Sequence, residues 1–156
     1  RDALGGWGLE SYPMVTGGKG IHVIAPLKPA AAWPEVKDFC QAFAKALEQT
    51  EPERFTANIR KAKRGGKVFI DYLRNERGST AVAPFSTRAK AGATVAVPVA
   101  WEELATIKGS GAFSLEAAAE RDHDPWPDYS ALTQSITLGM VEAVAGPVKA
   151  KPPPAD

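Results

Sequence analysis

The chain has 156 residues, enough for one modest domain, and 44% of them are hydrophobic, so it can build a core. Its 19 basic and 18 acidic residues leave a net charge of +1, so only local clustering of charge could favour nucleic acid. The single cysteine, Cys40, excludes a disulfide framework and a cysteine zinc site. No apolar run reaches the roughly 18–20 residues of a membrane helix. Residues 1–5 also lack an apolar signal core, which predicts a soluble, intracellular protein with no membrane partner.

The first third of the chain predicts two strands and one long helix. A short strand is expected at Tyr12–Val15, and the compact apolar run Ile21–Leu27 is typical of a buried strand. Residues 16–20 between them form a glycine-rich turn. Pro34 then opens a helix near residues 35–49. One face of that helix carries apolar residues at helical spacing: Val36, Phe39, Cys40, Phe43, Ala44 and Leu47.

The rest of the chain alternates loops with short elements. A basic loop at 60–67 precedes a strand at 68–73, an extended segment at 80–83 and a strand at 94–99. A short helix begins at Trp101, and helical patterns cover 115–121 and 130–144. We predict an α+β fold with a largely antiparallel sheet over residues 1–146, followed by a disordered Pro/Lys tail at 147–156. We expect the strands at 21–27 and 68–73 to be neighbours in one sheet, with the helix packed on one face.

The glycine-rich turn is a candidate phosphate site. Gly17 and Gly18 would let backbone N–H groups approach a ligand closely, and Lys19 supplies a positive charge. The spacing is not that of a P-loop, and a tight connection between two strands is the simpler interpretation. His22 follows on the strand, where it is either a hydrogen-bonded structural residue or part of an anion or metal site near Lys19.

Asp71 interrupts an otherwise apolar run at residues 68–73. A buried carboxylate needs a partner or a cation. One interpretation is an ion pair with Arg74 or Arg77. The other is a metal ligand, because hard divalent ions take carboxylate oxygens.

Three further groups carry charge. The basic run at 60–67 is either a solvated loop or a contact to a phosphate backbone. Arg88 is either a surface arginine or a guanidinium returned by its loop to bound phosphates. Asp122 and Asp124 have the spacing of many polymerase metal ligands, but they lie in a proline-rich connection, so we do not expect them to be catalytic.

Four motifs occur in an order that carries a resemblance to a known family. They are TGGKGIHV from Thr16, FTANIRKAKR ending at Arg64, VFIDYLRN from Val68 and TAVAPFSTR ending at Arg88. Together they resemble the polymerase domain of bacterial ligase D, within the archaeo-eukaryotic primase superfamily. The match runs from about Tyr12 to Leu104 and continues more weakly to Trp126.

The resemblance implies a DNA-directed nucleotidyltransferase of DNA end joining and repair, with two Mg²⁺ or Mn²⁺ ions in the intact domain. It implies that Asp71 is the third metal aspartate and is catalytic. The implied contacts to the nucleoside triphosphate are Thr16, Gly17, Gly18, Lys19, His22 and Arg88. The implied contacts to the DNA end are Lys61, Lys63 and Arg64. It also implies a ligase domain as partner and a bacterial, cytoplasmic, nucleoid-associated location.

One departure from the family limits what this chain can do. The family's first two metal aspartates lie on an Asp-x-Asp strand upstream of the glycine turn, whereas the fifteen residues before Thr16 hold one aspartate, Asp2. We therefore expect the chain to be the carboxyl-terminal half of the domain and to be inactive alone. We expect it to self-associate or to pair with a separately supplied amino-terminal half.

Two other functions remain open from the sequence. The chain could be a non-catalytic module that binds nucleotide or DNA phosphate through Lys19, Arg64 and Arg88. It could also be an unrelated metabolic enzyme that binds phosphate with its glycine turn. An upstream Asp-x-Asp strand would decide for the polymerase class.

Overall fold

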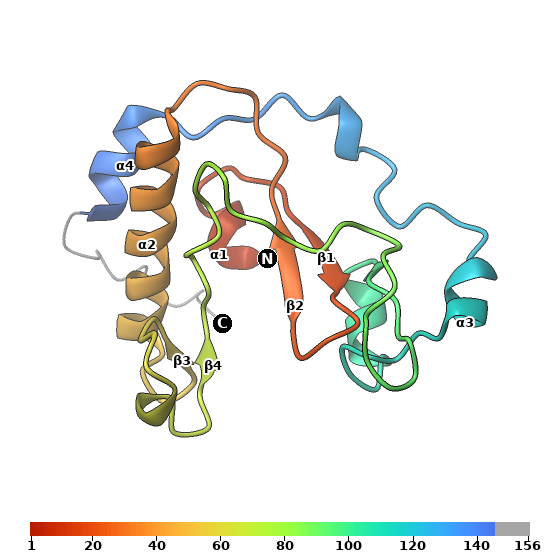
Figure 1. Cartoon of the computed structure of the whole chain (residues 1–156). Helices are drawn as coiled ribbons and strands as arrows, with labels where there is room; N and C mark the ends of the chain where they lie inside the picture. Colours follow the sequence, from red (N-terminus) through yellow and green to blue (C-terminus); the bar gives the residue numbers. More distant parts are fainter. Residues whose placement is uncertain (146–156) are drawn as a thin grey trace, which may run out of the picture. The chain divides into compact units, whose positions relative to one another are not determined.

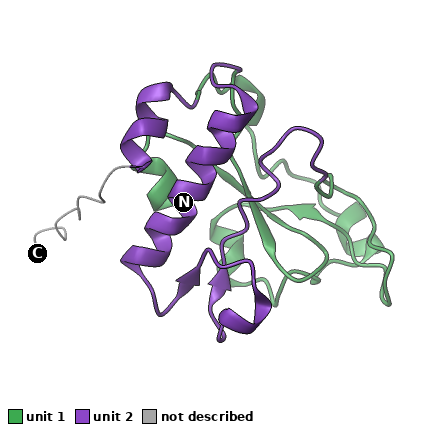
Figure 2. Cartoon of the chain, turned by 60° about the vertical axis from the view of Figure 1, so that its left-hand side comes forward, with its two compact units in different colours: residues 1–28, 81–135 green, residues 29–80, 136–156 purple. Residues whose placement is uncertain are grey.

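The computed structural model describes residues 1–145 (Figure 1). The predicted tail at 147–156, and residue 146 at its boundary, lie outside these residues. The chain divides into two compact units, each assembled from two separate stretches of sequence (Figure 2). Unit 1 comprises residues 1–28 and 81–135, and unit 2 comprises residues 29–80 together with residues from 136 onward. No helix in the described part of the chain is long and apolar enough to cross a membrane.

Unit 1 is built on a three-stranded antiparallel sheet. Strand β1 (Tyr12–Val15) lies in its centre, between β2 (Ile21–Ile24) and β5 (Val97–Pro98). The glycine turn joins β1 to β2 as a hairpin. Val15 stands opposite Ile21 on one side and Val97 on the other, so the register places the turn directly beyond these residues.

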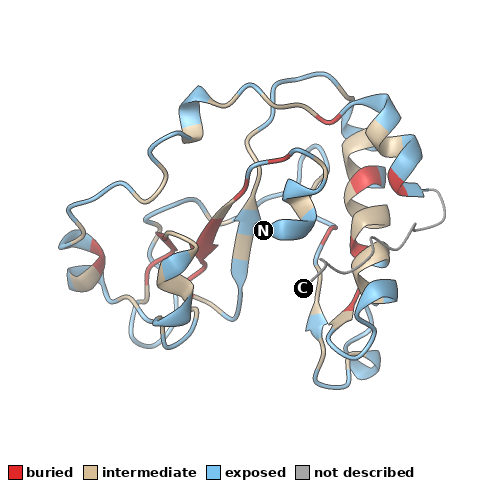
Figure 3. Cartoon of the chain, turned by 180° about the vertical axis from the view of Figure 1, so that it is seen from behind, coloured by how far each residue is buried: buried red, intermediate tan, exposed pale blue. Residues whose placement is uncertain are grey.

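Short helices surround this sheet in unit 1. They are α1 (Asp2–Gly5), the 3₁₀ helix η2 (Glu102–Ala105), α3 (Leu115–Ala119) and the 3₁₀ helix η3 (Tyr129–Ala131). Helix α3 begins where the Ser114 side chain accepts a hydrogen bond from the Ala117 N–H, which satisfies one free donor of the first turn. The core gathers small and β-branched side chains: Val15, Val95, Val97, Val99 and Ala118. Most of β1 is buried (Figure 3, red).

Strand β2 is an edge strand that ends at Ile24 and carries exposed apolar side chains, so the expectation of a buried strand at 21–27 is wrong. Ile21 and Val23 alternate along it and are 46% and 45% exposed. Within the described residues, no further strand pairs with the outer side of β2. Exposed edges of this kind are sites of strand addition. The expectation that this chain pairs with another segment or copy has a physical basis here, and it stays a prediction.

Unit 2 contains the long helix α2 (Trp33–Thr50), strands β3 (Phe55–Thr56) and β4 (Val68–Phe69), the 3₁₀ helix η1 (Lys61–Lys63) and α4 (Leu138–Ala145). Helix α2 begins where Pro34 occupies its first turn and the Glu35 carboxylate accepts a hydrogen bond from the Ala32 N–H. Helix α2 packs against α4 and β3. A small core joins α2 to the segment after β4: Ala44, Ala57 and Tyr72, with Cys40 and Ile70 beside them.

The α+β class and the antiparallel main sheet are confirmed, as are the helix near 35–49 and the short helices near 101 and 115–121. The expectation of one sheet containing residues 21–27 and 68–73 is wrong. Strand β4 pairs with β3 in a separate, parallel two-stranded sheet. The strand at 68–73 ends at Phe69, and the helix predicted at 130–144 begins only at Leu138. The shared sheet, the strand at 68–73 and the helix at 130–144 were all predicted from apolar patterns. Such patterns do not specify the segment against which an element packs.

The core of unit 2 yields a stability prediction at Tyr72. The residue is 7% exposed, and its hydroxyl accepts a hydrogen bond of 3.0 Å from Gln41 Nε2. We expect Tyr72→Ala to lower the free energy of unfolding by about 3–5 kcal/mol, because a buried aromatic ring is lost. Tyr72→Phe should cost only about 0.5–1.5 kcal/mol, since only the hydrogen bond is removed. Urea unfolding measures both, and Leu73→Ala, at a more exposed neighbour, is the control. Equal losses for the alanine and phenylalanine variants would contradict this account.

Candidate functional site

The glycine turn of unit 1 is closed by its own first residue. The Thr16 N–H donates to the Gly20 carbonyl at 3.1 Å, and the Thr16 hydroxyl donates to the same oxygen at 2.8 Å. The same hydroxyl oxygen accepts from the Gly18 N–H at 3.2 Å. Thr16 itself is buried. The hydroxyl therefore shapes the turn from inside, and its bonds are made within the protein.

Gly17 has no room for a side chain. Its φ is +65°, and a Cβ there would lie 2.8 Å from Arg88 Cγ and 2.9 Å from the Val95 carbonyl carbon. Both the backbone conformation and the packing thus require glycine. Arg88 is held beside the turn because its N–H donates to the Thr94 carbonyl at 2.8 Å.

The structure brings together two of the predicted phosphate-binding groups. The Arg88 guanidinium runs along the turn, with Nη2 3.9 Å from the Cβ position of Gly18. Lys19 lies exposed at the tip of the same turn. A backbone turn flanked by two cationic side chains can accept an anion.

His22 lies on β2 directly opposite Met14, so both side chains point to the same face of the sheet. It is half-buried and has interactions of its own within the fold. The predicted role of His22 at the phosphate site stays a prediction.

Asp71 follows β4 in unit 2, in an irregular segment. It is exposed rather than buried, so the expectation of a carboxylate inside a strand is wrong. Its Oδ1 accepts a hydrogen bond of 3.1 Å from the Leu73 N–H, which turns the chain locally. No described Lys, Arg or His forms an ion pair with it, and Arg74 instead donates to the Thr80 carbonyl. Its approach to the glycine turn, which belongs to the other unit, stays a prediction.

The basic loop of unit 2 presents two kinds of cation. Lys61 and Lys63 are exposed on the 3₁₀ helix η1. Arg64 is different, because its guanidinium lies over the Phe69 ring at 3.8 Å and donates to the Ile59 carbonyl at 2.9 Å. Arg64 therefore braces the loop against β4, while the two lysines face solvent.

Sequence reasoning missed two residues of the turn site, Thr94 and Ser110. Their hydroxyls donate to the carbonyls of Gly17 and Gly18. Ser110 lies in a second glycine-rich segment, Lys108–Gly111, which was the one available signal. These contacts join residues 77 and 92 positions apart, and a single sequence carries no pattern that predicts contacts of such separation.

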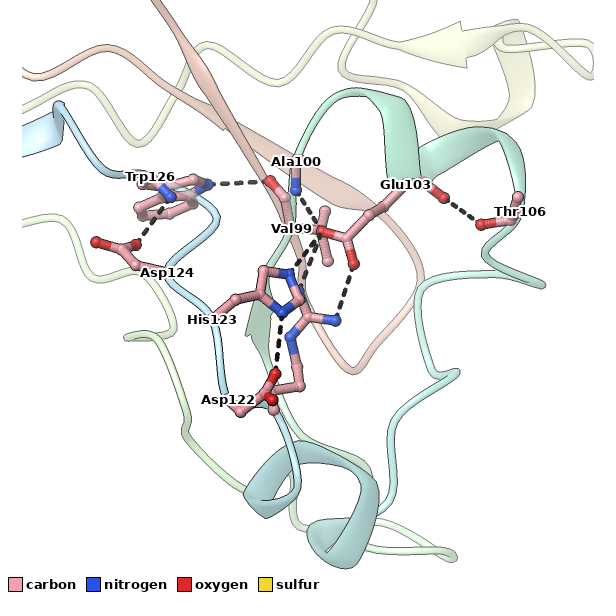
Figure 4. A network of polar contacts seen from close by, with 9 residues as sticks. Val99, Ala100, Glu103, Thr106, Asp122, His123, Asp124 and Trp126 are labelled. Atoms are coloured by element: carbon pink, nitrogen blue, oxygen red, sulfur yellow. Dashed lines mark hydrogen bonds and ion pairs between the residues drawn. The ribbon is translucent and has the colours of Figure 1, made fainter.

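Asp122 and Asp124 do not act as a pair in unit 1 (Figure 4). Asp124 Oδ1 accepts from the Trp126 N–H at 2.8 Å, whereas Asp122 faces His123 Nδ1 at 3.6 Å. Nearby, Arg121 forms a bidentate ion pair with Glu103, at 2.9 and 3.0 Å. These contacts hold the loop in place, and the expectation that Asp122 and Asp124 are not catalytic stays a prediction.

Comparison with known proteins gives consistent results for this chain. A family described as "LigD, primase-polymerase domain" matches residues 1–126. The multifunctional non-homologous end joining protein LigD of Pseudomonas aeruginosa is 42% identical over 138 residues, or 85% of this chain. The chain belongs to the LigD primase-polymerase family.

Other members of the LigD family agree in sequence and in structure. The bifunctional non-homologous end joining protein LigD of Bacillus subtilis is 34% identical over 76% of the chain. A solved structure, the polymerase domain of Mycobacterium tuberculosis ligase D in complex with DNA, superposes with a TM-score of 0.75 at 32% identity. That match covers 84% of this chain and 46% of the solved one. The chain spans only 16% of the P. aeruginosa protein and 20% of the B. subtilis protein.

The close approach at Gly17 can be tested with a matched pair of variants. We expect Gly17→Ala to lower the free energy of unfolding by about 1–3 kcal/mol, because the new methyl group meets Arg88 and Val95 in a strained backbone. Gly20→Ala should change it by less than about 0.5 kcal/mol, since nothing lies within 4 Å of its Cβ position. Thermal unfolding of both variants measures the difference. Similar values for the two would show that the turn does not depend on this packing.

The Glu103–Arg121 ion pair predicts a pH-dependent stability. The hydrogen bond from Arg121 holds the pKa of Glu103 below its usual range, against the opposing effect of burial. The ion pair therefore stabilises the fold above the unfolded-state pKa, and this contribution is lost as pH falls through the lowered folded-state pKa. We expect Glu103→Gln to cost about 1–3 kcal/mol at neutral pH and progressively less under acid conditions.

Glu102→Gln is the matched control for that measurement. Glu102 pairs with Arg1 at the surface, with its side chain 76% exposed, so its removal should have almost no effect at any pH. Urea unfolding at a series of pH values gives both curves. A Glu103→Gln deficit that stays constant from neutral to acid pH would refute the electrostatic origin of the effect.

Proposed function

We propose that this chain supplies the triphosphate-binding turn and the third metal aspartate of a DNA-directed nucleotidyltransferase that acts in DNA end joining. Membership of the LigD primase-polymerase family supports the reaction class. The solved relative bound to DNA supports a DNA end as partner. The remaining metal ligands would come from sequence outside this chain.

One observation carries the proposal for the triphosphate. The Arg88 side chain packs directly on the glycine turn, whose tip carries the exposed Lys19. Arg88 and the turn come from segments far apart in the sequence, yet the Arg88 side chain lies against the turn that carries Lys19. A nucleoside triphosphate carries its charge along a chain of phosphate oxygens, which suits two separated cations around a backbone turn.

Asp71 suits a divalent ion by the chemistry of its donor. Its carboxylate is exposed and forms no ion pair with a described residue, and hard ions such as Mg²⁺ and Mn²⁺ prefer carboxylate oxygens. One carboxylate does not complete a site. The described residues contain no cluster of three or more His, Cys, Asp or Glu that could hold a metal ion. Asp71 is thus one ligand of a site that other residues must finish.

The roles of these residues in the reaction follow from their charges. A primer 3′-hydroxyl attacks the α-phosphate of the bound nucleotide, a new phosphodiester bond forms, and pyrophosphate leaves. Lys19 and Arg88 hold the β- and γ-phosphates and neutralise the charge that develops on the leaving group. When bound, the divalent ions would add charge neutralisation at the attacking and leaving oxygens.

The DNA end would be held by the basic loop of unit 2. Lys61 and Lys63 are exposed and can reach phosphate oxygens, and each neutralised phosphate strengthens binding in a salt-dependent manner. Arg64 contributes chiefly by bracing the loop on Phe69.

A second function, a non-catalytic module that binds nucleotide or DNA phosphate, is favoured by one observation. Asp71 is the one predicted metal ligand in this chain, and the described residues offer no complete cluster. A primer-extension assay with Mn²⁺ separates the two functions. In both cases the 156-residue chain alone should not extend a primer; only nucleotidyl transfer predicts extension once the complete domain is supplied.

Two substitutions in the complete domain test the separate roles. Asp71→Ala should abolish primer extension while sparing DNA binding, because it removes a metal ligand and no cation. Lys19→Ala should raise the KM for the nucleotide by about 10-fold, because a charged contact to phosphate is lost. Steady-state extension and DNA-binding titrations measure both effects.

The controls are Asp122→Ala and Lys28→Ala, two exposed residues of unit 1 outside the proposed site. Neither should change extension by more than about twofold. If Asp71→Ala and Lys19→Ala weaken DNA binding equally, the roles proposed for them are wrong.

A further inference from the structure

Two hydroxyl groups from outside the glycine turn hold its carbonyls. Thr94 Oγ1 donates to the Gly17 carbonyl at 2.5 Å, and Ser110 Oγ donates to the Gly18 carbonyl at 2.7 Å. Both hydroxyls belong to unit 1, on the segments that follow Arg88 and precede α3. The two carbonyls belong to consecutive residues, so the two hydroxyls fix the orientation of two adjacent peptide planes.

Fixing a carbonyl also fixes the N–H of the same peptide. In a trans peptide the C=O and N–H point in opposite directions, and the described residues contain no cis peptide. The Gly17 carbonyl points at Thr94, and the N–H of the same plane, that of Gly18, is accepted by Thr16 Oγ1. The Gly18 carbonyl points at Ser110, so the Lys19 N–H must point away from it.

The Lys19 N–H is left available to a ligand. No described residue accepts a hydrogen bond from it or from the Gly20 N–H, and both residues are exposed. A backbone N–H of the exposed residue Lys19, one residue after the Gly18 that the Arg88 guanidinium approaches, is a donor for an anion. If the Gly18–Lys19 peptide turned over, a carbonyl oxygen would replace this donor and repel the anion.

Glycine makes such an inversion easy. Gly17 and Gly18 have no Cβ, so their backbone dihedral angles can change widely at little energetic cost. The peptide planes next to them can therefore rotate. The turn therefore needs an external restraint to keep one orientation. Thr94 and Ser110 supply that restraint. Gly111 packs beside it, with its Cβ position 3.6 Å from the Thr94 methyl and 4.0 Å from the Gly17 carbonyl oxygen.

We propose that Thr94 and Ser110 are positioning residues that hold the glycine turn with its Lys19 N–H directed at the bound phosphates. This inference rests on the proposed triphosphate role of the turn. Neither hydroxyl contacts the nucleotide itself. Each acts by fixing the orientation of a peptide plane, before the ligand arrives.

The test uses the 156-residue chain and inorganic triphosphate as the probe, with binding measured by calorimetry. Ser110→Ala should weaken binding by about 10-fold, because it releases the peptide plane whose Lys19 N–H is the donor to the charged ligand. Thr94→Val should weaken binding by less, about 3-fold, because the Gly17–Gly18 plane that it releases is still held by the hydrogen bond from the Gly18 N–H to Thr16 Oγ1. Ser110→Thr and Thr94→Ser, which keep a hydroxyl, should restore most of the affinity. Thr106→Val removes a hydroxyl that bonds only to the Glu103 carbonyl and should leave binding unchanged.

An amide NMR signature separates this role from a general structural one. Triphosphate should shift the Lys19 amide resonance in the wild type and in Ser110→Thr, and should shift it far less in Ser110→Ala at equal saturation. Unchanged affinity in both hydroxyl-deletion variants, with Lys19→Ala still weakening binding, would overturn this inference alone. Absence of triphosphate binding to the wild-type chain would overturn the proposed function, and this inference with it. Thermal unfolding identifies any variant that fails to fold, and the threonine and serine variants then decide the matter.

Discussion

At Gly17 the backbone around Val95 and the side chain of Arg88 both approach the glycine turn closely. The Val95 backbone and the Arg88 side chain both lie within 3 Å of the place where a Cβ would be. This distance lets Val95 enter the core beside Val15, and it lets Arg88 lie along the turn. A larger residue would push the strand and the guanidinium away together. The absence of a side chain at Gly17 therefore determines both the packing of Val95 in the core and the position of the Arg88 guanidinium beside the turn.

The sequence predicted the elements whose signal is local. Helix α2 was expected near 35–49 because its apolar residues repeat at helical spacing, and it is found at Trp33–Thr50. The hairpin around residues 16–20 was expected because glycines separate two apolar runs. Membership of the family could also be inferred, because four motifs occur in a fixed order. The helix and the turn each have a signal within a few neighbouring residues, whereas the family is indicated by four short motifs spread over residues 16–88.

Non-local pairing could not be predicted in the same way. The run at 68–73 looked like a partner for 21–27, yet β4 pairs with β3, which is only two residues long. Asp71 looked buried because its neighbours are apolar, but strand geometry ends at Phe69 and Asp71 is exposed. The hydroxyls of Thr94 and Ser110 bond to the turn across 77 and 92 residues of sequence. Such contacts depend on the tertiary fold and leave no periodic trace in the sequence.

The interleaving of the two units has a consequence for the order of folding. Gln134 bonds to Glu10 through both its side-chain amide groups, across 124 residues, and its backbone carbonyl accepts from the Lys28 N–H. Helix α4, at Leu138–Ala145, in turn packs on α2 of unit 2. Neither unit can close until nearly all of this sequence has left the ribosome. Contacts of such long separation slow folding and prolong the exposure of apolar segments to other chains.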